Sequence, residues 1–216
     1  MRLLKESKPI TDEQDLYAIK AWTANGGQYE KDYPLTNKEL DRLNKLADSN
    51  ILNLSAPLYR MIDLSFNQWN KIFQSITGID FRPIRVKYQN ALKGMMDNGD
   101  KDELEQVMTM VHNKRYDIVN NYSPKFERFQ SFTPDFYRAF SYSSDNCGRQ
   151  INWDYRDNYR IIYAIPNHER LKGVHIKDYS VYTDEDEYLI SNKNNFYVVD
   201  AQMFTENTVI LVIQNI

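Results

Sequence analysis

The amino-acid sequence predicts an α+β fold, and two observations support this class. Residues 1–50 have mainly helical patterning, whereas runs of β-branched and aromatic residues bounded by turn residues dominate the chain after Pro124. The 10 Phe, 16 Tyr and 3 Trp residues indicate a well-packed core with many half-buried tyrosines. Because 216 residues can bury a sizeable core without disulfides, we expect one domain over 1–216, with a helical layer at 1–50 and a core at 51–216.

Two helices are expected in the first part of the chain. Thr11 is a capping residue followed by acidic residues, and apolar residues then recur at helical spacing over 16–22. The Asn-Gly-Gly sequence at 25–27 ends this helix. The second helix is expected from Thr36 to about Ser49, where leucines share one face.

The middle of the chain is less regular. Residues 56–62 are expected to form a short strand, residues 65–75 a helix, and residues 101–120 the clearest helix of the chain. The stretch 79–100 is ambiguous, and its segment 81–87 is consistent with either a strand or an extended loop.

The last part is expected to be mostly β-structure. Apolar residues alternate over 126–133, and Pro134 suits the first turn of a short helix that reaches about Ser143. The expected strands that follow are 159–165, 188–190, 195–199 and 208–213.

Composition disfavours several classes of protein. The formal net charge of −3 argues against a polybasic nucleic-acid-binding protein, and none of the seven glycines forms a dinucleotide-binding or phosphate-binding loop. Cys147, the single cysteine, excludes an internal disulfide framework, and His112, His168 and His175 lack metal-ligand spacing, so no metal is expected. No apolar run is long enough to span a membrane, and the charged first residues do not suit a signal peptide, so we expect a cytoplasmic protein.

Two elements carry polar residues in apolar surroundings. Arg60 lies in the apolar stretch 58–62, and an arginine in a half-buried strand needs an anion, either a structural carboxylate or a ligand phosphate. Ser131 and Thr133 share one face of a strand just before a helix begins. Their alternative role is ordinary hairpin or capping chemistry.

The third element is the acidic run at 184–187. If the strand at 188 starts early, Glu185 and Glu187 project from the same side. Two such carboxylates can divide the chemistry, one stabilising a cationic intermediate and the other handling an acceptor. The alternative is a solvated acidic turn.

The order of these three elements resembles that of the R-S-E class of ADP-ribosyltransferases, particularly the phage-encoded enzymes of the Alt and Mod type. Pro57-Leu-Tyr-Arg60 resembles their P-L-[WY]-R strand, and the segment from Ser131 to Phe140 resembles their Ser-x-Ser element and the helix after it. The segment from Asp184 to Phe196 is similar to their E-x-E-x-[ML]-I motif, turn and Phe-bearing strand. The resemblance covers roughly residues 55–200, while 63–125 departs from the family pattern and leaves room for an insertion.

The resemblance implies two packed sheets of mixed and antiparallel strands that bind NAD without a Rossmann fold. NAD is the substrate, nicotinamide is released, and the ribose left behind is cationic. Glu187 is then the catalytic glutamate, Ser131 orients it, and Arg60 clamps the NAD phosphates. Thr133 supports the strand at the third hydroxyl position. Met61 follows the arginine where the family often has glycine beside the nicotinamide amide.

The resemblance also implies further contacts with NAD and the acceptor. Phe140 lines the nicotinamide pocket unless it belongs to the core. Glu185 binds an acceptor guanidinium, and the loop 178–184 offers Tyr179 and Tyr182 for stacking. The implied enzyme is a toxin-like or phage-encoded protein-arginine ADP-ribosyltransferase that acts on host proteins in a bacterial cytoplasm.

Three alternatives remain open. RNA or DNA could be the acceptor, because basic residues could form a local patch despite the acidic total charge. The chain could be an NAD glycohydrolase, in which water replaces the acceptor, or a non-enzymatic interaction protein with a degenerate transferase fold. The residues of the candidate patch are Arg82, Arg85, Lys87, Lys114 and Arg115.

Overall fold

The computed structural model describes residues 9–25, 27–99, 101–139, 159–166, 170–182, 184–205 and 208–216. Within these ranges the strands form two sheets of four strands each, which confirms the mixed helix-and-sheet class. The first sheet contains, in spatial order, β1 (Ile51–Asn53), β5 (Arg170–His175), β6 (Tyr188–Ile190) and β3 (Gln130–Phe132). The second contains β2 (Leu58–Leu64), β4 (Tyr159–Ile165), β8 (Thr208–Asn215) and β7 (Phe196–Thr205).

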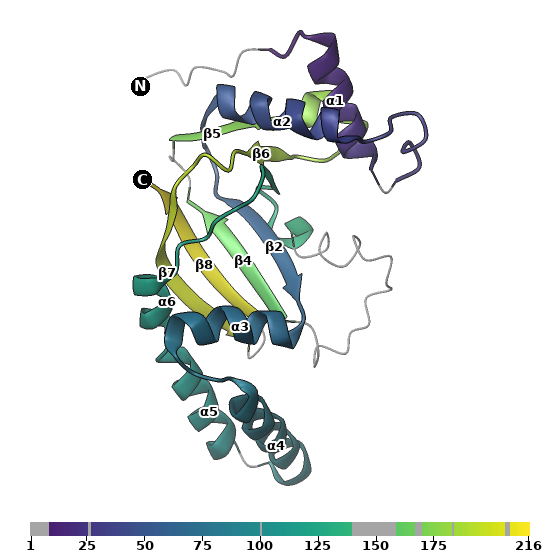
Figure 1. The fold of residues 1–216 in the computed structure, drawn as a ribbon. Coiled ribbons are helices and arrows are strands. Elements are labelled where there is room, and N and C mark those ends of the chain that lie inside the picture. The colour runs from purple at the N-terminus through teal and green to yellow at the C-terminus, as the bar shows by residue number, and fades with distance from the viewer. Residues whose placement is uncertain are drawn as a thin grey trace.

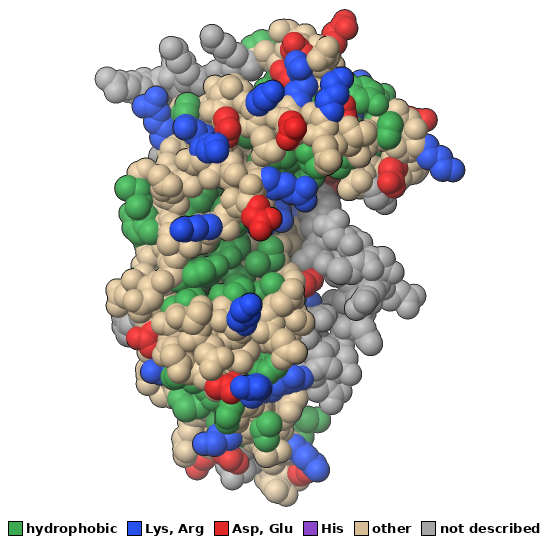
Figure 2. All heavy atoms as spheres, in the orientation of Figure 1, with side chains coloured by type: hydrophobic (Ala, Val, Ile, Leu, Met, Phe, Trp, Pro, Cys, Tyr) green, Lys and Arg blue, Asp and Glu red, His purple; other side chains and the backbone are tan. Residues whose placement is uncertain are grey.

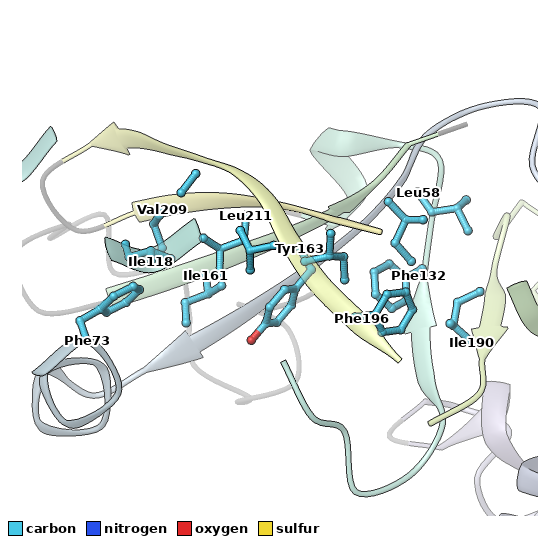
Figure 3. Close-up of a cluster of buried hydrophobic side chains, with 14 of the residues drawn as sticks. Leu58, Phe73, Ile118, Phe132, Ile161, Tyr163, Ile190, Phe196, Val209 and Leu211 are labelled. Atoms are coloured by element: carbon cyan, nitrogen blue, oxygen red, sulfur yellow. The ribbon is translucent and has the colours of Figure 1, made fainter. Parts of the chain in front are cut away.

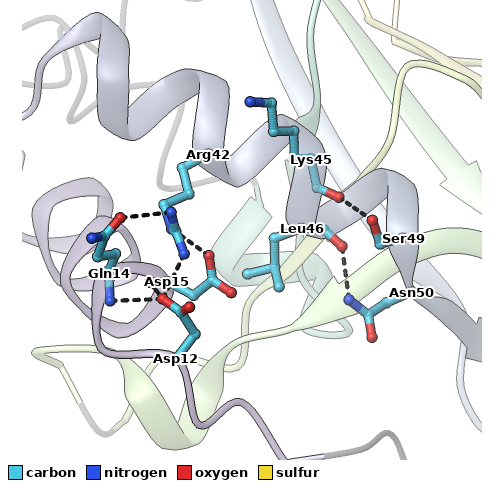
Figure 4. Close-up of polar contacts among 8 residues, drawn as sticks. All are labelled: Asp12, Gln14, Asp15, Arg42, Lys45, Leu46, Ser49 and Asn50. Atoms are coloured by element: carbon cyan, nitrogen blue, oxygen red, sulfur yellow. Dashed lines mark hydrogen bonds and ion pairs between the residues drawn. The ribbon is translucent and has the colours of Figure 1, made fainter.

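Helices α1 (Glu13–Ala24) and α2 (Asn37–Ser49) form the expected N-terminal layer and pack together over the first sheet (Figure 1). Thr11 was the expected cap of α1, but the cap is Asp12, whose carboxylate accepts hydrogen bonds from the two backbone amides that follow in the first turn. Arg42 of α2 joins the helices, because its guanidinium binds both Asp12 and Asp15 (Figure 4). These bonds lower the pKa of Asp12, chiefly through the helix amides.

In the described part of the chain between β2 and β3 there are four helices: α3 (Phe66–Thr77), α4 (Arg82–Asn98), α5 (Asp102–His112) and α6 (Arg115–Asn121). Helices α3 and α6 pack against the second sheet, whereas α4 and α5 project from the end opposite α1 and α2 (Figure 1). The strand or extended loop expected at 81–87 is wrong, because Pro83 occupies the first turn of a helix that Gly99 ends in a left-handed conformation. The single helix expected at 101–120 is two helices with a turn at 113–114.

The β-rich part follows the sequence pattern closely. The strands at 159–165 and 188–190 are confirmed, and those expected at 195–199 and 208–213 continue to Thr205 and Asn215. The alternating segment 126–133 contains a strand only at 130–132, since Phe126 packs on Tyr163 and Phe196 instead of joining a ladder. The helix expected at 134–143 begins two residues later, at 136, and is described to 139; residues 140–143 lie outside the described residues.

The two sheets pack face to face around the main hydrophobic core. Phe132 and Ile190 come from the first sheet, Ile161 and Leu211 from the second, and Phe73 from α3 (Figure 3). A second cluster, in which Leu43 of α2 and Leu189 of β6 are fully buried, lies between the helical layer and the other face of the first sheet. The first sheet is therefore covered on both faces, and its edge at β3 meets the second sheet.

The surface view separates apolar from charged regions. Hydrophobic side chains are exposed across the middle of this face, over the second sheet, while charged side chains of both signs crowd the α1–α2 end (Figure 2). None of the helices in the described ranges combines the length and apolar character needed to span a bilayer.

Candidate active site

Arg60 lies on β2, directly opposite Tyr163 of β4 in the antiparallel register. Its Nη1 donates a hydrogen bond to the backbone oxygen of Ser131 at 2.9 Å. Its Nε is buried and has no hydrogen-bond partner in the described part of the chain. Burial lowers the pKa of Arg60, while the nearby Glu187 and Tyr163 act in the opposite direction. The Arg60 guanidinium is therefore a largely enclosed cation that can still donate a further hydrogen bond.

Backbone pairing explains why Arg60 meets Ser131. Strand β3 pairs with β6 of the first sheet, and one residue later Thr133 forms a bridge with Tyr59 of β2. The Tyr59 amide donates to the Thr133 oxygen at 2.7 Å, and the Thr133 amide donates back at 3.0 Å. The chain of β3 thus joins the two sheets at the residues expected to carry chemistry.

Thr133 has a local structural task. Its side chain is buried, and its Oγ1 accepts a hydrogen bond from the Asp135 amide at 3.2 Å. This is a capping interaction at the start of the helical segment 136–139, so the hydroxyl supports the turn that follows β3.

Glu187 stands immediately before β6 and already belongs to its ladder, because its oxygen accepts from the Ile176 amide at 3.0 Å. Ser131 pairs with Leu189, two residues after Glu187, so Ser131 and Glu187 point to the same face of the sheet. The Ser131 hydroxyl lies near enough to the Glu187 carboxylate to lower the pKa of that group by hydrogen bonding. The structure therefore brings Arg60, Ser131 and Glu187 together.

A fourth residue at this carboxylate comes from the helical layer. Trp22 of α1 donates its indole N–H to Glu187 Oε1 at 2.7 Å, and its ring packs edge-on against Phe129 at 5.0 Å. From the sequence, Trp22 is only the last of the apolar residues that recur at helical spacing over 16–22. Its indole N–H was the available signal, because a buried tryptophan usually finds an acceptor for that group.

The protonation of Glu187 reflects these contacts. Burial raises the pKa of the Glu187 carboxyl group, the bonds from Ser131 and Trp22 lower it, and the charge of Glu185 raises it. Arg60 lowers it further. A carboxylate with a raised pKa and a fixed orientation is typical of a catalytic site.

The rest of the acidic run is not a simple solvated turn. Asp184 accepts two hydrogen bonds from Arg138, one to its backbone oxygen at 2.6 Å and one to Oδ2 at 3.0 Å. The same Nη2 of Arg138 lies 3.9 Å from Glu185 Oε1. Asp186 contacts His175 Nε2 at 2.6 Å. Asp184 and Glu185 therefore share Arg138 as a partner, and Asp186 has His175.

Tyr179 and Tyr182, expected to stack on an acceptor, face the helical layer. The Tyr179 hydroxyl accepts from the Ile10 amide at 2.9 Å, and its ring packs on the second core cluster. The Tyr182 ring lies 5.7 Å from that of Tyr29, and its hydroxyl approaches Gly27 so closely that an added Cβ would lie 2.2 Å away. Both tyrosines are half-buried and attach this loop to the N-terminal part.

Two other residues were expected to contact NAD, and the structure describes one of them, Met61. Met61 is buried next to Arg60 in β2, so its side chain points to the opposite face of the sheet. Phe140 lies outside the described residues. Within the described ranges, no group of three or more His, Cys, Asp or Glu side chains could hold a metal ion.

The fold, with its two packed sheets and N-terminal helices, is similar to that of solved ADP-ribosyltransferases. One similar structure is the ADP-ribosyltransferase Vis from Vibrio splendidus in complex with agmatine, with a TM-score of 0.50 and 9% identity over 98% of this chain and 78% of that chain. Another is C3stau2 from S. aureus with NAD, with a TM-score of 0.51 and 16% identity over 95% of this chain and 89% of that chain. No protein-family model and no curated protein sequence matches this chain.

Proposed function

We propose that this chain is an NAD-dependent mono-ADP-ribosyltransferase whose acceptor is a guanidinium group of protein arginine. The observation that carries the proposal is the meeting of Arg60, Ser131 and Glu187 at the sheet junction, where a half-buried cation and a half-buried carboxylate lie close together without forming a direct ion pair in the described contacts. Such an arrangement suits a substrate that carries both anionic phosphates and a developing positive charge.

The residues present fit NAD. The buried Nε of Arg60 lacks a protein partner among the described residues, which suits an anionic oxygen of a phosphate. Glu187 would hold a ribose hydroxyl and stabilise positive charge on the ribose carbon as nicotinamide leaves. Ser131 and Trp22 would keep its carboxylate oriented and ionised. The similar C3stau2 structure with NAD supports this assignment.

Glu185 would receive the acceptor. It is partly exposed, with 19% of its side chain accessible, and its carboxylate is near enough to Glu187 to affect its pKa. An arginine has to lose a proton to attack carbon, and a carboxylate beside the reacting atoms can bind the guanidinium and take that proton. The similar Vis structure contains agmatine, a small molecule with a guanidinium group, which supports an arginine acceptor.

The test is to incubate the protein with NAD and agmatine and to measure free nicotinamide and ADP-ribosylated agmatine. Glu187→Gln should lower both products by at least about 10²-fold, because a neutral amide no longer stabilises the positive charge. Glu127→Gln is the matched control, since Glu127 is an exposed carboxylate outside the site. Unchanged product formation by Glu187→Gln would overturn the assignment of the catalytic residue.

The same assay separates the remaining alternatives. Nicotinamide release without transfer indicates an NAD glycohydrolase. If a lysate is labelled from NAD and nuclease treatment removes the label, the acceptor is RNA or DNA. The proposed basic patch receives little support, because Arg82 is paired with Asp80 and the Arg85 guanidinium lies over the Phe66 ring. The likeness to phage enzymes and action in a bacterial cytoplasm remain predictions, which labelling of bacterial lysate proteins would support.

A further inference from the structure

A guanidinium of the chain itself lies at the carboxylate where an acceptor would bind. Arg138 follows the Ser-x-Thr element, and its backbone amide is held by the side chain of Asp135 at 3.1 Å. From there its side chain reaches the acidic run, where it binds Asp184 twice and places Nη2 3.9 Å from Glu185 Oε1. Among the described contacts of Glu185, the partner of its carboxylate is thus an arginine.

We propose that Arg138 is itself an acceptor, so that the protein ADP-ribosylates this residue in its own site. This inference rests on the proposed function. Glu185 and Glu187 are close enough to interact electrostatically, so a guanidinium at Glu185 is also near the carboxylate that would stabilise the ribose cation. Arg138 combines the chemistry of the proposed substrate with the position of the proposed acceptor.

The Asp184 contact does not prevent this reaction. The Asp184 side chain is 77% exposed and that of Arg138 is 29% exposed, so water and ions screen their attraction. A pair held in this way keeps the guanidinium near Glu185 and still lets it turn toward a bound substrate. If Arg138 only held this loop in place, its bonds to Asp184 would be sufficient, and the approach of its Nη2 to Glu185 would have no role.

The proposed step balances with NAD as the only co-reactant. One terminal nitrogen of Arg138 forms a bond to the ribose carbon, while the bond from that carbon to the nicotinamide nitrogen breaks. Nicotinamide leaves as a neutral molecule and takes the bonding electron pair. The guanidinium proton passes to Glu185 and then to water, so the products are ADP-ribosyl-Arg138, nicotinamide and a proton.

The direct experiment needs no variant. The purified full chain is incubated with NAD without any acceptor, and its intact mass and proteolytic peptides are measured. We expect a gain of one ADP-ribosyl group on the peptide that contains Arg138. Because Arg138 would react in the active site of the same molecule, the reaction is intramolecular. The fraction of protein modified per unit time should therefore not change on tenfold dilution. Modification only at other residues, or a rate that falls with dilution, would overturn the inference.

Variants sharpen the result. Arg138→Lys should lower self-modification at least tenfold. Arg82→Lys should leave it unchanged, because Arg82 is also paired with an aspartate but is distant in sequence from Arg138. Added agmatine should compete with self-modification. A rise in melting temperature with NAD shows that the Arg138→Lys protein is folded. If agmatine is modified but Arg138 is not, the inference fails alone, whereas absence of nicotinamide release removes the proposed function and the inference with it.

Discussion

Around Glu187, side chains from distant parts of the chain hold one another in place, whereas in α4 most side chains face solvent. Trp22 reaches Glu187 across 165 positions of sequence, and Arg60 reaches Ser131 across 71. In α4, by contrast, Ala91 is the buried residue, and Met96 is 77% exposed. One region is defined by long-range contacts and the other mainly by contacts between neighbouring helices.

The difference shows where this fold can support chemistry. A carboxylate must be oriented within fractions of an ångström to act on a substrate, and that orientation comes from packed neighbours whose own positions are fixed. The α4–α5 pair has few buried side chains in its described part, so it should open locally at a lower free energy than the sheets. The three expected site residues accordingly lie at the sheet junction.

The largest effect should come from a cavity in the second core cluster. Leu43→Ala should lower the free energy of unfolding by about 2–5 kcal/mol, because Leu43 is fully buried between the helical layer and the first sheet. Met96→Ala in α4 should change it by about 0.5 kcal/mol or less. Urea unfolding of both variants measures the difference. Equal destabilisation would contradict the contrast between the two regions.

Much of the fold could be predicted because its signals are local. Strand β4 was predicted to the residue, since a continuous run of β-branched and aromatic residues is typical of a strand buried on both faces. Strand β5 was missed because charged residues and Gly173 interrupt its pattern. That glycine is required by packing, as an added Cβ would lie 2.8 Å from the Leu189 oxygen. Nothing within β5 itself reveals this neighbour.

The candidate site was predictable only in part for the same reason. Arg60, Ser131 and Glu187 could be selected because their order and local contexts form a pattern along the chain. Trp22 and Arg138 could not, because their roles depend on partners that are distant in sequence. An apolar helix position and a surface arginine have many ordinary uses, and only the tertiary contacts distinguish these two.

The indole of Trp22 offers a smaller and more specific test of the junction. Trp22→Phe keeps an aromatic ring against Phe129 but removes the donor to the Glu187 carboxyl group. Nicotinamide release should fall about tenfold, the size expected for one hydrogen bond to a charged group. The pKa of Glu187 should rise further, so the acid limb of the pH–rate profile should move to higher pH.

Trp69→Phe is the matched control for Trp22→Phe. Trp69 is buried in α3, and its indole nitrogen has no partner among the described residues. Its replacement should lower stability without moving the acid limb. Glu185→Gln should move that limb in the opposite direction, because removal of a like charge lowers the pKa of Glu187. Shifts in the same direction for Trp22→Phe and Glu185→Gln would contradict the electrostatic account.

The smallest expected effect is on stability at Glu187 itself. Burial raises the folded-state pKa of this carboxyl group, so the ionised form costs stability once the pH rises through that value. Glu187→Gln avoids this cost. Its melting temperature should match that of the parent at low pH and exceed it near pH 7, by about 2–4 °C if the gain is about 1 kcal/mol. Differential scanning calorimetry across pH, with Glu127→Gln as the exposed control, measures the difference. If the difference in melting temperature does not depend on pH, ionisation of Glu187 costs no stability. Packing alone would then account for the order of the sheet junction.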